Sequence, residues 1–427
     1  MVLRTLLLSV LLVSAATAEV LLVTDVTIHT MGARGTIDNG SLLIEDGMVV
    51  AIGNDLEVPA DAEVIAGDSR VITPGIFDPY SYLGIVEIDL VEQTVDGRQS
   101  GNRYTASFDV APAVNPRSTL IPINRIEGIT HAMVAPTPAY AEANLISGLG
   151  ALISLGGIDD FMVKEGAALF VQLGEGGAGS TYGSRAAAVL ALREALEDAR
   201  DFDKHRTEYE QGRRRTYSVG RYDLEALQWV LDRDIPMVIT ANRASDIEQV
   251  LDLAEQEDLW IIVNGGAEAW MVAERLEAAH VPVILDPTRN LPEAFESLNA
   301  TLESAARLHE AGVKIAFSTS DSHNSRNLRQ LAGNAVANGL PWIEALRAIT
   351  ATPASLYAAF DGIGTLGVDQ PANLVIWSGD PLEVTTHAER VFIDGRAISM
   401  HSRQTLLRDR YLDSDNDMPP AYRKPAP

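Results

Sequence analysis

The sequence predicts an α/β protein in which a TIM-like (β/α)8 barrel is joined to a small β-sandwich domain built from both chain ends. Three observations carry this prediction. Short strand-like runs separated by turns fill the start of the chain, strand-like and helix-like runs alternate through its middle, and strand-like runs return near its end. Repeated strand and helix pairs imply parallel strands, and their extent over residues 73–359 suits an eightfold barrel, whose usual size is ~250 residues.

The chain opens with a predicted export signal. Residues 1–18 (MVLRTLLLSVLLVSAATA) combine an early arginine, an apolar core and a small-residue end, which predicts cleavage before Glu19. A membrane anchor or a first buried strand are the alternatives, but the apolar run is shorter than the ~20 residues that a spanning helix needs. We therefore expect a bacterial signal peptide, an exported, periplasmic protein, and no membrane span after signal removal.

The predicted β-sandwich domain combines residues 19–72 with residues 360–412. Its first part contains short strands such as EVLLVTDVTIHT and MVVAIG, and its second part contains ANLVIWSGDPLE and ERVFIDGRAIS. Residues 73–359 repeat pairs such as IPMVITA with DIEQVLDLAEQ and form the predicted barrel. Residues 413–427 (DSDNDMPPAYRKPAP) are acidic and then proline-rich, so we expect a C-terminal tail that could reach a neighbouring subunit.

Composition limits the partners of the chain. It has 59 acidic and 33 basic residues, and its formal net charge of -26 repels nucleic acid and anionic membranes. It has no cysteine, so its stability must come from the core rather than from disulfides. The basic run at residues 213–215 follows an acidic helix, and we expect a solvated loop there rather than a phosphate-binding patch.

The stretch VITPGIFDPYSYLG, residues 71–84, has the layout of an entry into a catalytic barrel. Tyr80 and Tyr82 stand two apart in it and therefore share one face of the strand. Two histidines in their place would point into the barrel mouth and bind zinc or another divalent ion. The phenols instead either fill that space by stacking and hydrogen bonding or line an aromatic ligand pocket.

Several segments together carry a resemblance to a known family. They are IEDG at residues 44–47, the 71–84 stretch, GVKIAFSTSDSHNSRNL, ALRAITATPASLY, and TLG at residues 365–367 leading to ANLVIWSGDPLE. In this combination they resemble the amidohydrolase superfamily, and within it the exported imidazolonepropionase-like group, with the metal-ligand histidines replaced. The resemblance implies a hydrolase of carbon–nitrogen bonds other than peptide bonds, which uses a divalent metal such as zinc.

The resemblance also assigns positions to the metal site. The family has a His-x-His pair, two further histidines and an aspartate, each at the end of a barrel strand. The corresponding positions here are Tyr80, Tyr82, Thr240, Asn264 and Asp321. A lysine or glutamate that completes the site in some members corresponds to Glu175 or, less well, to Lys164.

These residue types argue against a tight metal site. Neutral tyrosine, threonine and asparagine are poor zinc donors, and a tyrosine with a pKa near ~10 would have to lose its proton to bind better. Calcium takes roughly six or more oxygens, and two phenols would fill much of that space. We therefore expect no metal and no cofactor in this chain.

Three functions remain open. The chain is a catalytically silent or strongly altered amidohydrolase that acts as a subunit of an oligomer. Alternatively it is a residual, metal-independent amidohydrolase that uses Asp321 with His323 or Glu175, where His323 either serves as a general base near neutral pH or caps its own turn. The third possibility is a periplasmic protein that binds a small molecule in the barrel mouth.

The glycine-rich segment GEGGAGSTYGSRA, which begins at Gly174, offers two further interpretations. GEGGAG matches a dinucleotide-binding pattern, but no second strand ending in an acidic residue follows, so a flexible barrel loop fits better. Arg185 opens the next helix, whose free N–H groups could bind a carboxylate or phosphate, or it forms a surface ion pair at an ordinary helix start. Serine catalysis within STSDSHN, residues 318–324, is also open, although sequence neighbours rarely form a triad.

Two segments favour association with another subunit. One is the polar tail, and the other is DKHRTEYEQGRRRTYSVGR with its neighbouring residue, which together contain Tyr209, Tyr217 and Tyr222. Tyrosine and arginine are enriched at the centres of interfaces. We therefore expect a homo-oligomer, or a hetero-oligomer with an active amidohydrolase paralogue, in which the tail crosses to a neighbour.

Overall fold

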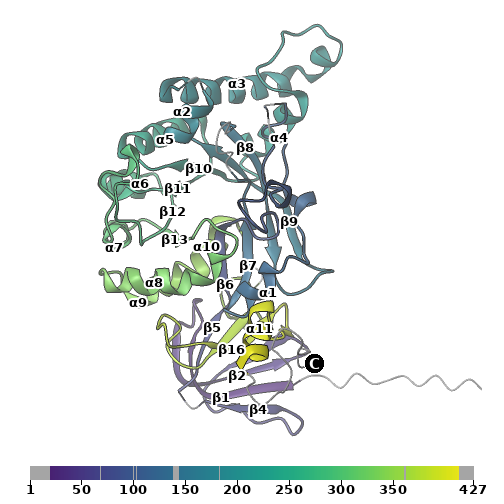
Figure 1. Cartoon of the computed structure of the whole chain (residues 1–427), viewed down its shortest axis with the longest axis vertical. Coiled ribbons are helices and arrows are strands. Elements are labelled where there is room, and N and C mark those ends of the chain that lie inside the picture. The colour runs from purple at the N-terminus through teal and green to yellow at the C-terminus, as the bar shows by residue number, and fades with distance from the viewer. Residues whose placement is uncertain are drawn as a thin grey trace, which may run out of the picture.

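The structure is a computed structural model that describes residues 20–67, 69–99, 101, 103–137, 144–181, 183–359 and 362–412. The strands of the two chain ends, purple and yellow, lie together in one part of the molecule, and the barrel occupies the other part (Figure 1). This arrangement confirms the predicted α/β fold class, with a nearly closed barrel and a separate sheet of terminal strands. The predicted signal peptide and the predicted tail lie outside the described residues.

The terminal strands form one nine-stranded sheet in the order β14-β3-β2-β1-β5-β15-β16-β17, with β4 paired to β1. These strands are β1 (Val20–His29), β2 (Thr36–Glu45), β3 (Met48–Gly53), β4 (Glu63–Ala66), β5 (Val71–Pro74), β14 (Gln370–Pro371), β15 (Leu374–Trp377), β16 (Ala388–Ile393) and β17 (Arg396–Ala397). Strand β5 pairs antiparallel with β15, and the buried indole of Trp377 donates to Thr73 Oγ1 at 2.9 Å. The two ends of the chain are therefore joined in one folded unit.

Eight strands form the barrel sheet, in the order β13-β12-β11-β10-β9-β8-β7-β6. They are β6 (Ile76–Ser81), β7 (Ile129–Val134), β8 (Ile146–Ser154), β9 (Met162–Gln172), β10 (Met237–Ala241), β11 (Ile261–Gly265), β12 (Val283–Leu285) and β13 (Ile315–Phe317). Parallel pairing holds from β9 to β13 and between β6 and β7. The expectation of parallel strands is wrong at β8, which runs antiparallel to β7 and β9 because a short connection without a helix joins it to β9.

Helices lie around the outside of the barrel (Figure 1). They are α1 (Leu120–Arg125), α2 (Glu175–Ser180), α3 (Arg185–Glu210), α4 (Arg221–Leu231), α5 (Ala244–Glu257), α6 (Ala273–Ala278), α7 (Ser304–Glu310), α8 (Leu328–Ala337), α9 (Trp342–Arg347) and α10 (Ala351–Leu356), and α11 (Arg403–Leu412) follows the terminal sheet. In α5, apolar residues at helical spacing, such as Ile247, Val250 and Leu251, are buried. Across the described ranges, none of the helices combines the length and apolarity needed to cross a membrane.

The basic run after α3 is only partly solvated, because it folds back onto that helix. Arg214 pairs with Asp201 at 2.5 Å, and the Tyr217 hydroxyl donates to the same carboxylate at 2.8 Å. Arg214 and Tyr217 hold the pKa of Asp201 at about 2. Tyr217 is buried and stacks on Tyr209 with ring centroids 5.5 Å apart, so of the three predicted interface tyrosines only Tyr222 is strongly exposed, at 65%.

Candidate functional site

The carboxyl ends of the barrel strands surround a polar cavity of about 160 Å³. Parallel strands bring their ends to one face of a barrel, which is where barrel sites form. The cavity is lined by Tyr80, Tyr82, Gln172, Thr240, Asn242, Asn264, Gly265, Ile284, Leu285, Asp286, Arg289, Ser318, Thr319 and Ser320. Four of the five positions assigned to the metal site by resemblance are therefore gathered on one cavity, which we call the mouth cavity.

Tyr80 on β6 and Tyr82 just after its end form one aromatic wall of the mouth cavity. Their ring centroids lie 5.9 Å apart in an edge-on arrangement, and Tyr80 makes a similar contact with Phe170 at 5.4 Å. Burial raises the pKa of Tyr80, while hydrogen bonds with Tyr82, Gln172 and Thr240 oppose that shift. The Tyr80 phenol therefore keeps its proton near neutral pH and serves as a hydrogen-bonding group, in addition to filling space.

Thr240 and Asn264 form the second part of the lining. They are register partners on the neighbouring strands β10 and β11, and Asn264 Nδ2 donates to Thr240 Oγ1 at 3.1 Å. Asn264 is only 6% exposed. This hydrogen bond orients both side chains before any ligand arrives.

Asp321 does not line the mouth cavity. Its Oδ1 accepts from the backbone N–H groups of His323 and Asn324 at 2.8 and 3.2 Å, and its Oδ2 accepts from Asn324 Nδ2 at 3.0 Å. The lining after β13 ends at Ser320, which has a φ of 50° and turns the chain away. The carboxylate of Asp321 thus closes a local turn.

The residual catalytic set of Asp321, His323 and Glu175 is not assembled in the structure. His323 contacts the guanidinium of Arg326 at 2.7 Å, and partial burial together with that positive charge lowers its pKa. Glu175 lies at the start of α2, after β9, and its half-exposed carboxylate is 3.7 Å from Arg185. In the described part of the chain no hydrogen bond or ion pair joins any two of the three side chains, because each is held by a different neighbour.

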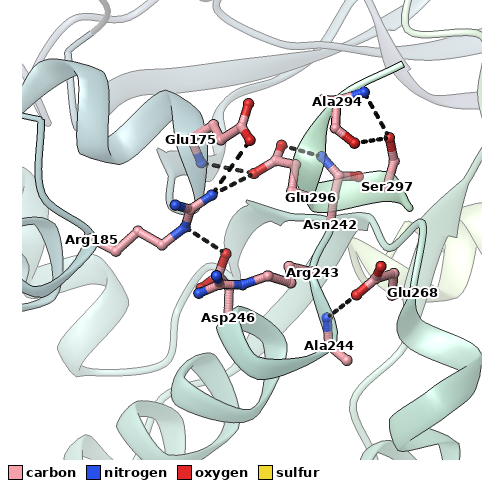
Figure 2. Close-up of polar contacts among 10 residues, drawn as sticks. All are labelled: Glu175, Arg185, Asn242, Arg243, Ala244, Asp246, Glu268, Ala294, Glu296 and Ser297. Carbon is pink, nitrogen blue, oxygen red and sulfur yellow. Dashed lines mark hydrogen bonds and ion pairs between the residues drawn. The ribbon is translucent and has the colours of Figure 1, made fainter. Parts of the chain in front are cut away.

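Arg185 lies in a cluster of acidic residues (Figure 2) and, with Asp246, lines a second cavity of about 530 Å³. Its Nε donates to Asp246 at 3.0 Å, and its Nη2 lies 3.7 Å from both Glu175 and Glu296. The helix start itself is capped, because Ser184 Oγ accepts from the backbone N–H of Ala187 at 3.3 Å. The predicted anion site at Arg185 therefore already holds protein carboxylates. The sequence predicted a flexible loop before Arg185. This prediction is wrong, because residues of GEGGAG form most of the short helix α2.

Acidic residues of this region tie together the loops after four strands, β9 to β12. Glu296, after β12, accepts from Asn242 Nδ2 and from the Glu175 N–H, both at 2.8 Å (Figure 2). Buried Glu268, after β11, accepts from the backbone N–H groups of Ala244 and Asn299 at 3.0 and 3.1 Å. These carboxylates hold residues 294–299 against the rim of the mouth.

Sequence reasoning missed a buried acid beneath the mouth cavity. Asp78 on β6 has no exposed surface, and its Oδ1 accepts from Ser318 Oγ at 2.8 Å and from the Tyr80 N–H at 3.1 Å. Burial raises its pKa to about 7, with hydrogen bonds from Ser325, Ser318 and Tyr80 acting against that shift. The available signal was an aspartate inside a short, apolar strand that had no lysine or arginine beside it.

The donors of the mouth cavity do not fit the divalent metal that the family implies. Tyr80, Thr240 and Asn264 are neutral, and Asn264 uses one amide proton on Thr240. Among the described residues there is no group of three or more histidine, cysteine, aspartate or glutamate side chains placed to hold a metal ion. Zinc needs three or four good donors, which this lining does not offer.

Comparisons with known proteins agree on one family. The model of the amidohydrolase family matches residues 240–398. Amidohydrolase tasK of Hapsidospora irregularis is 23% identical over 393 residues, which are 84% of this chain but 40% of tasK. An imidazolonepropionase of Geobacillus kaustophilus is 42% identical over 60 residues, 12% of this chain and 14% of that protein. The chain thus spans well under half the length of these two relatives.

Solved structures extend the likeness over almost the whole chain. The crystal structure of an amidohydrolase from Thermotoga maritima has a TM-score of 0.78 and 25% identity, and the match covers 89% of this chain and 99% of that one. Molinate hydrolase, with a TM-score of 0.53 and 16% identity over 90% of this chain and 95% of that one, supports the fold alone.

Proposed function

Because this chain belongs to the amidohydrolase family of hydrolases, we propose that its barrel mouth binds a small polar molecule and that metal-dependent hydrolysis has been lost. One observation carries the proposal. The positions that correspond to the family's metal ligands, Tyr80, Tyr82, Thr240 and Asn264, meet around one cavity but offer uncharged hydrogen-bonding groups. A concave site with a few oriented polar groups suits a small ligand.

The side chains that line the cavity also indicate the chemical class of the ligand. Phenol, hydroxyl and carboxamide groups both donate and accept, so the ligand should carry donors and acceptors as well. Exposed Arg289 stands at the rim and adds one positive charge. Asp286 accepts from the Thr288 hydroxyl at 2.6 Å and is therefore already engaged. Small amides, ureas and carboxylates match this set of groups.

Calorimetric titration with acetamide, urea, hydantoin, acetate and glycine tests the proposal. We expect at least one of them to bind, and we expect Asn264→Leu to weaken that binding by about tenfold or more because a buried donor and acceptor are lost. Asn334→Leu, which changes an exposed asparagine on α8, is the matched control and should bind normally. Absence of binding by every compound, or equal affinity in the Asn264 variant, would contradict the proposal.

A subunit role is our second proposal, and exposed apolar loop tips favour it. Leu90 lies in the loop after β6 with 94% of its surface exposed, and Phe295 lies in the loop after β12 with 83% exposed. Both loops leave the mouth end of the barrel, and large exposed apolar side chains are common in contact surfaces. We propose a homo-oligomer or a hetero-oligomer with an active amidohydrolase paralogue.

Light scattering of the mature chain tests this second proposal. We expect a dimer or larger species that weakens when Leu90→Ser and Phe295→Ser are combined. A chain ending at Leu412 measures the contribution of the predicted tail, and Val58→Ser, at another exposed apolar position, is the control. A monomer at all concentrations, with no relative co-purifying from the native host, would remove the proposal.

A further inference from the structure

Ser318 and Asp78 form a hydrogen-bonded pair between the mouth cavity and the barrel interior. Ser318 lies directly after β13 and lines the cavity, while Asp78 lies on β6 with no exposed surface. The Ser318 hydroxyl is 2.8 Å from Asp78 Oδ1 and 2.6 Å from the carbonyl oxygen of Tyr80, so its proton has two acceptors. When Asp78 is ionised, its carboxylate is the stronger acceptor of the two.

We propose that Ser318 acts as a nucleophile in the mouth cavity, with the Asp78 carboxylate as its base, toward small acyl compounds. The proposal rests on the proposed binding function, because the compound must enter the same cavity. It differs from serine catalysis with Asp321 or His323, whose side chains do not face the cavity. A serine next to a positioned base is the recurring arrangement for nucleophilic catalysis.

The backbone around Ser318 supports this role. Ser320 adopts a φ of 50°, a conformation that non-glycine residues rarely take, and its N–H donates to Ser318 Oγ at 3.0 Å. The Tyr80 N–H donates to Asp78 Oδ1 at 3.1 Å and orients the carboxylate. Strained backbone of this kind is found disproportionately at functional sites. Two strands therefore hold the nucleophile and the base in one fixed relation.

The chemical step balances without any further reactant. Ser318 Oγ attacks the carbonyl carbon, an O–C bond forms, and the hydroxyl proton passes to Asp78. The bond from carbon to the leaving nitrogen or oxygen then breaks, and Asp78 returns the proton to the leaving group. A water molecule that attacks the resulting ester repeats the sequence and frees Ser318. Tyr80 and Asn264 carry hydrogen-bond donors and line the cavity that the carbonyl oxygen of the acyl compound would enter.

The ionisation of Asp78 sets when the base is available. Its pKa of about 7 is raised by burial and, to a smaller extent, by Asp321, and it is lowered by the hydroxyls of Ser325 and Ser318 and by the Tyr80 N–H. The phenol of Tyr357 lies close enough for mutual electrostatic influence. A base with a pKa near the working pH is the most effective kind.

Methanesulfonyl fluoride, a small serine-reactive reagent, tests the proposal on the mature full chain. Ser318 Oγ would form a bond to sulfur, fluoride would leave, and the serine proton would pass to Asp78. We expect one sulfonyl group per chain, placed on Ser318 by peptide mass spectrometry, at a rate that rises with pH through about pH 7. Ser318→Ala should remove the label, and Asp78→Asn should slow labelling by about a hundredfold.

Ser322→Ala is the matched control, because Ser322 lies in the same loop but does not line the cavity. It should be labelled like the wild type. No adduct on wild-type Ser318, an adduct on another residue, or a rate that is equal in Asp78→Asn would each overturn the proposal. Binding of a panel compound without labelling would remove the nucleophile and leave the binding function, whereas labelling without such binding would support the nucleophile alone.

Discussion

Replacing Asp78 by asparagine should stabilise the protein above about pH 7 and should change its stability little near pH 4. Folding raises the pKa of Asp78 from 3.8 to about 7, so the native state holds this proton more tightly than the unfolded state does. Below pH 3.8 the Asp78 carboxyl is protonated in both the native and the unfolded state, so its ionisation does not affect stability. Between these two pKa values the free energy of unfolding of the wild type falls as pH rises. Above the native-state pKa the wild type bears the full cost of burying an ionised carboxylate.

The pKa shift sets the size of the effect. From 3.8 to about 7, at ~1.36 kcal/mol per pKa unit, it corresponds to on the order of 4 kcal/mol. Burial is the cause that dominates, and the side chain has no exposed surface through which solvent could screen the charge. Asparagine keeps the acceptor for Ser318 and for the Tyr80 N–H but carries no charge, so it should escape this cost.

Urea unfolding followed by circular dichroism at about pH 4.5, 6 and 8 measures the difference between the two proteins. The free energy of unfolding of Asp78→Asn minus that of the wild type should grow across this range. Asp55→Asn removes an exposed carboxylate from a loop and should give a curve parallel to that of the wild type. Parallel curves for Asp78→Asn as well would refute the reasoning, because Asp78 would then titrate alike in both states.

Three further predictions are simpler to test. Protein purified without chelator should contain far less than one equivalent of zinc, manganese, iron or nickel by elemental analysis, because the cavity side chains at the family's metal positions are neutral, and a stoichiometric metal would contradict this. Glu296→Ala should cost ~0.5–1.5 kcal/mol in urea unfolding and speed proteolysis of the loop after β12, because the half-buried amide of Asn242 and the exposed N–H of Glu175 lose their acceptor, whereas Glu303→Ala should do neither. Export should remove residues 1–18, so N-terminal sequencing of periplasmic protein should begin at Glu19; an intact N-terminus in the cytoplasm would sink that prediction.

The sequence was sufficient for the architecture because its signals are local. Alternating strand and helix patterns located the barrel, and strand patterns at both ends located the terminal sheet. The antiparallel strand β8 was missed because a strand's direction depends on its connections, which hydrophobic patterns do not report. The resemblance placed Thr240 and Asn264 on adjacent strands, where the structure finds them in direct hydrogen bond.

The site was harder to predict than the fold because it depends on single dihedral angles and on burial. Ser320 lines the cavity, whereas Asp321, the next residue, closes a turn. The positive φ of Ser320 makes this difference. Asp78 reads in the sequence as one more residue of the FDPY strand. Its importance comes from the surrounding barrel, which removes water from its carboxylate, and no local pattern reports that.

The uncharged side chains at the family's metal positions in the mouth and the raised pKa of Asp78 are physically linked. The causes that act on the Asp78 pKa include burial, hydroxyl and N–H donors and the like charge of Asp321, but no cationic side chain of the described part of the chain. A divalent cation held above Asp78 would favour the carboxylate and draw its pKa back down. The metal prediction and the pH prediction are therefore coupled: a protein that carried a stoichiometric metal should show no growing advantage for Asp78→Asn at high pH. If the protein carried a stoichiometric metal and Asp78→Asn still gained stability as pH rose, the metal would lie away from the mouth cavity.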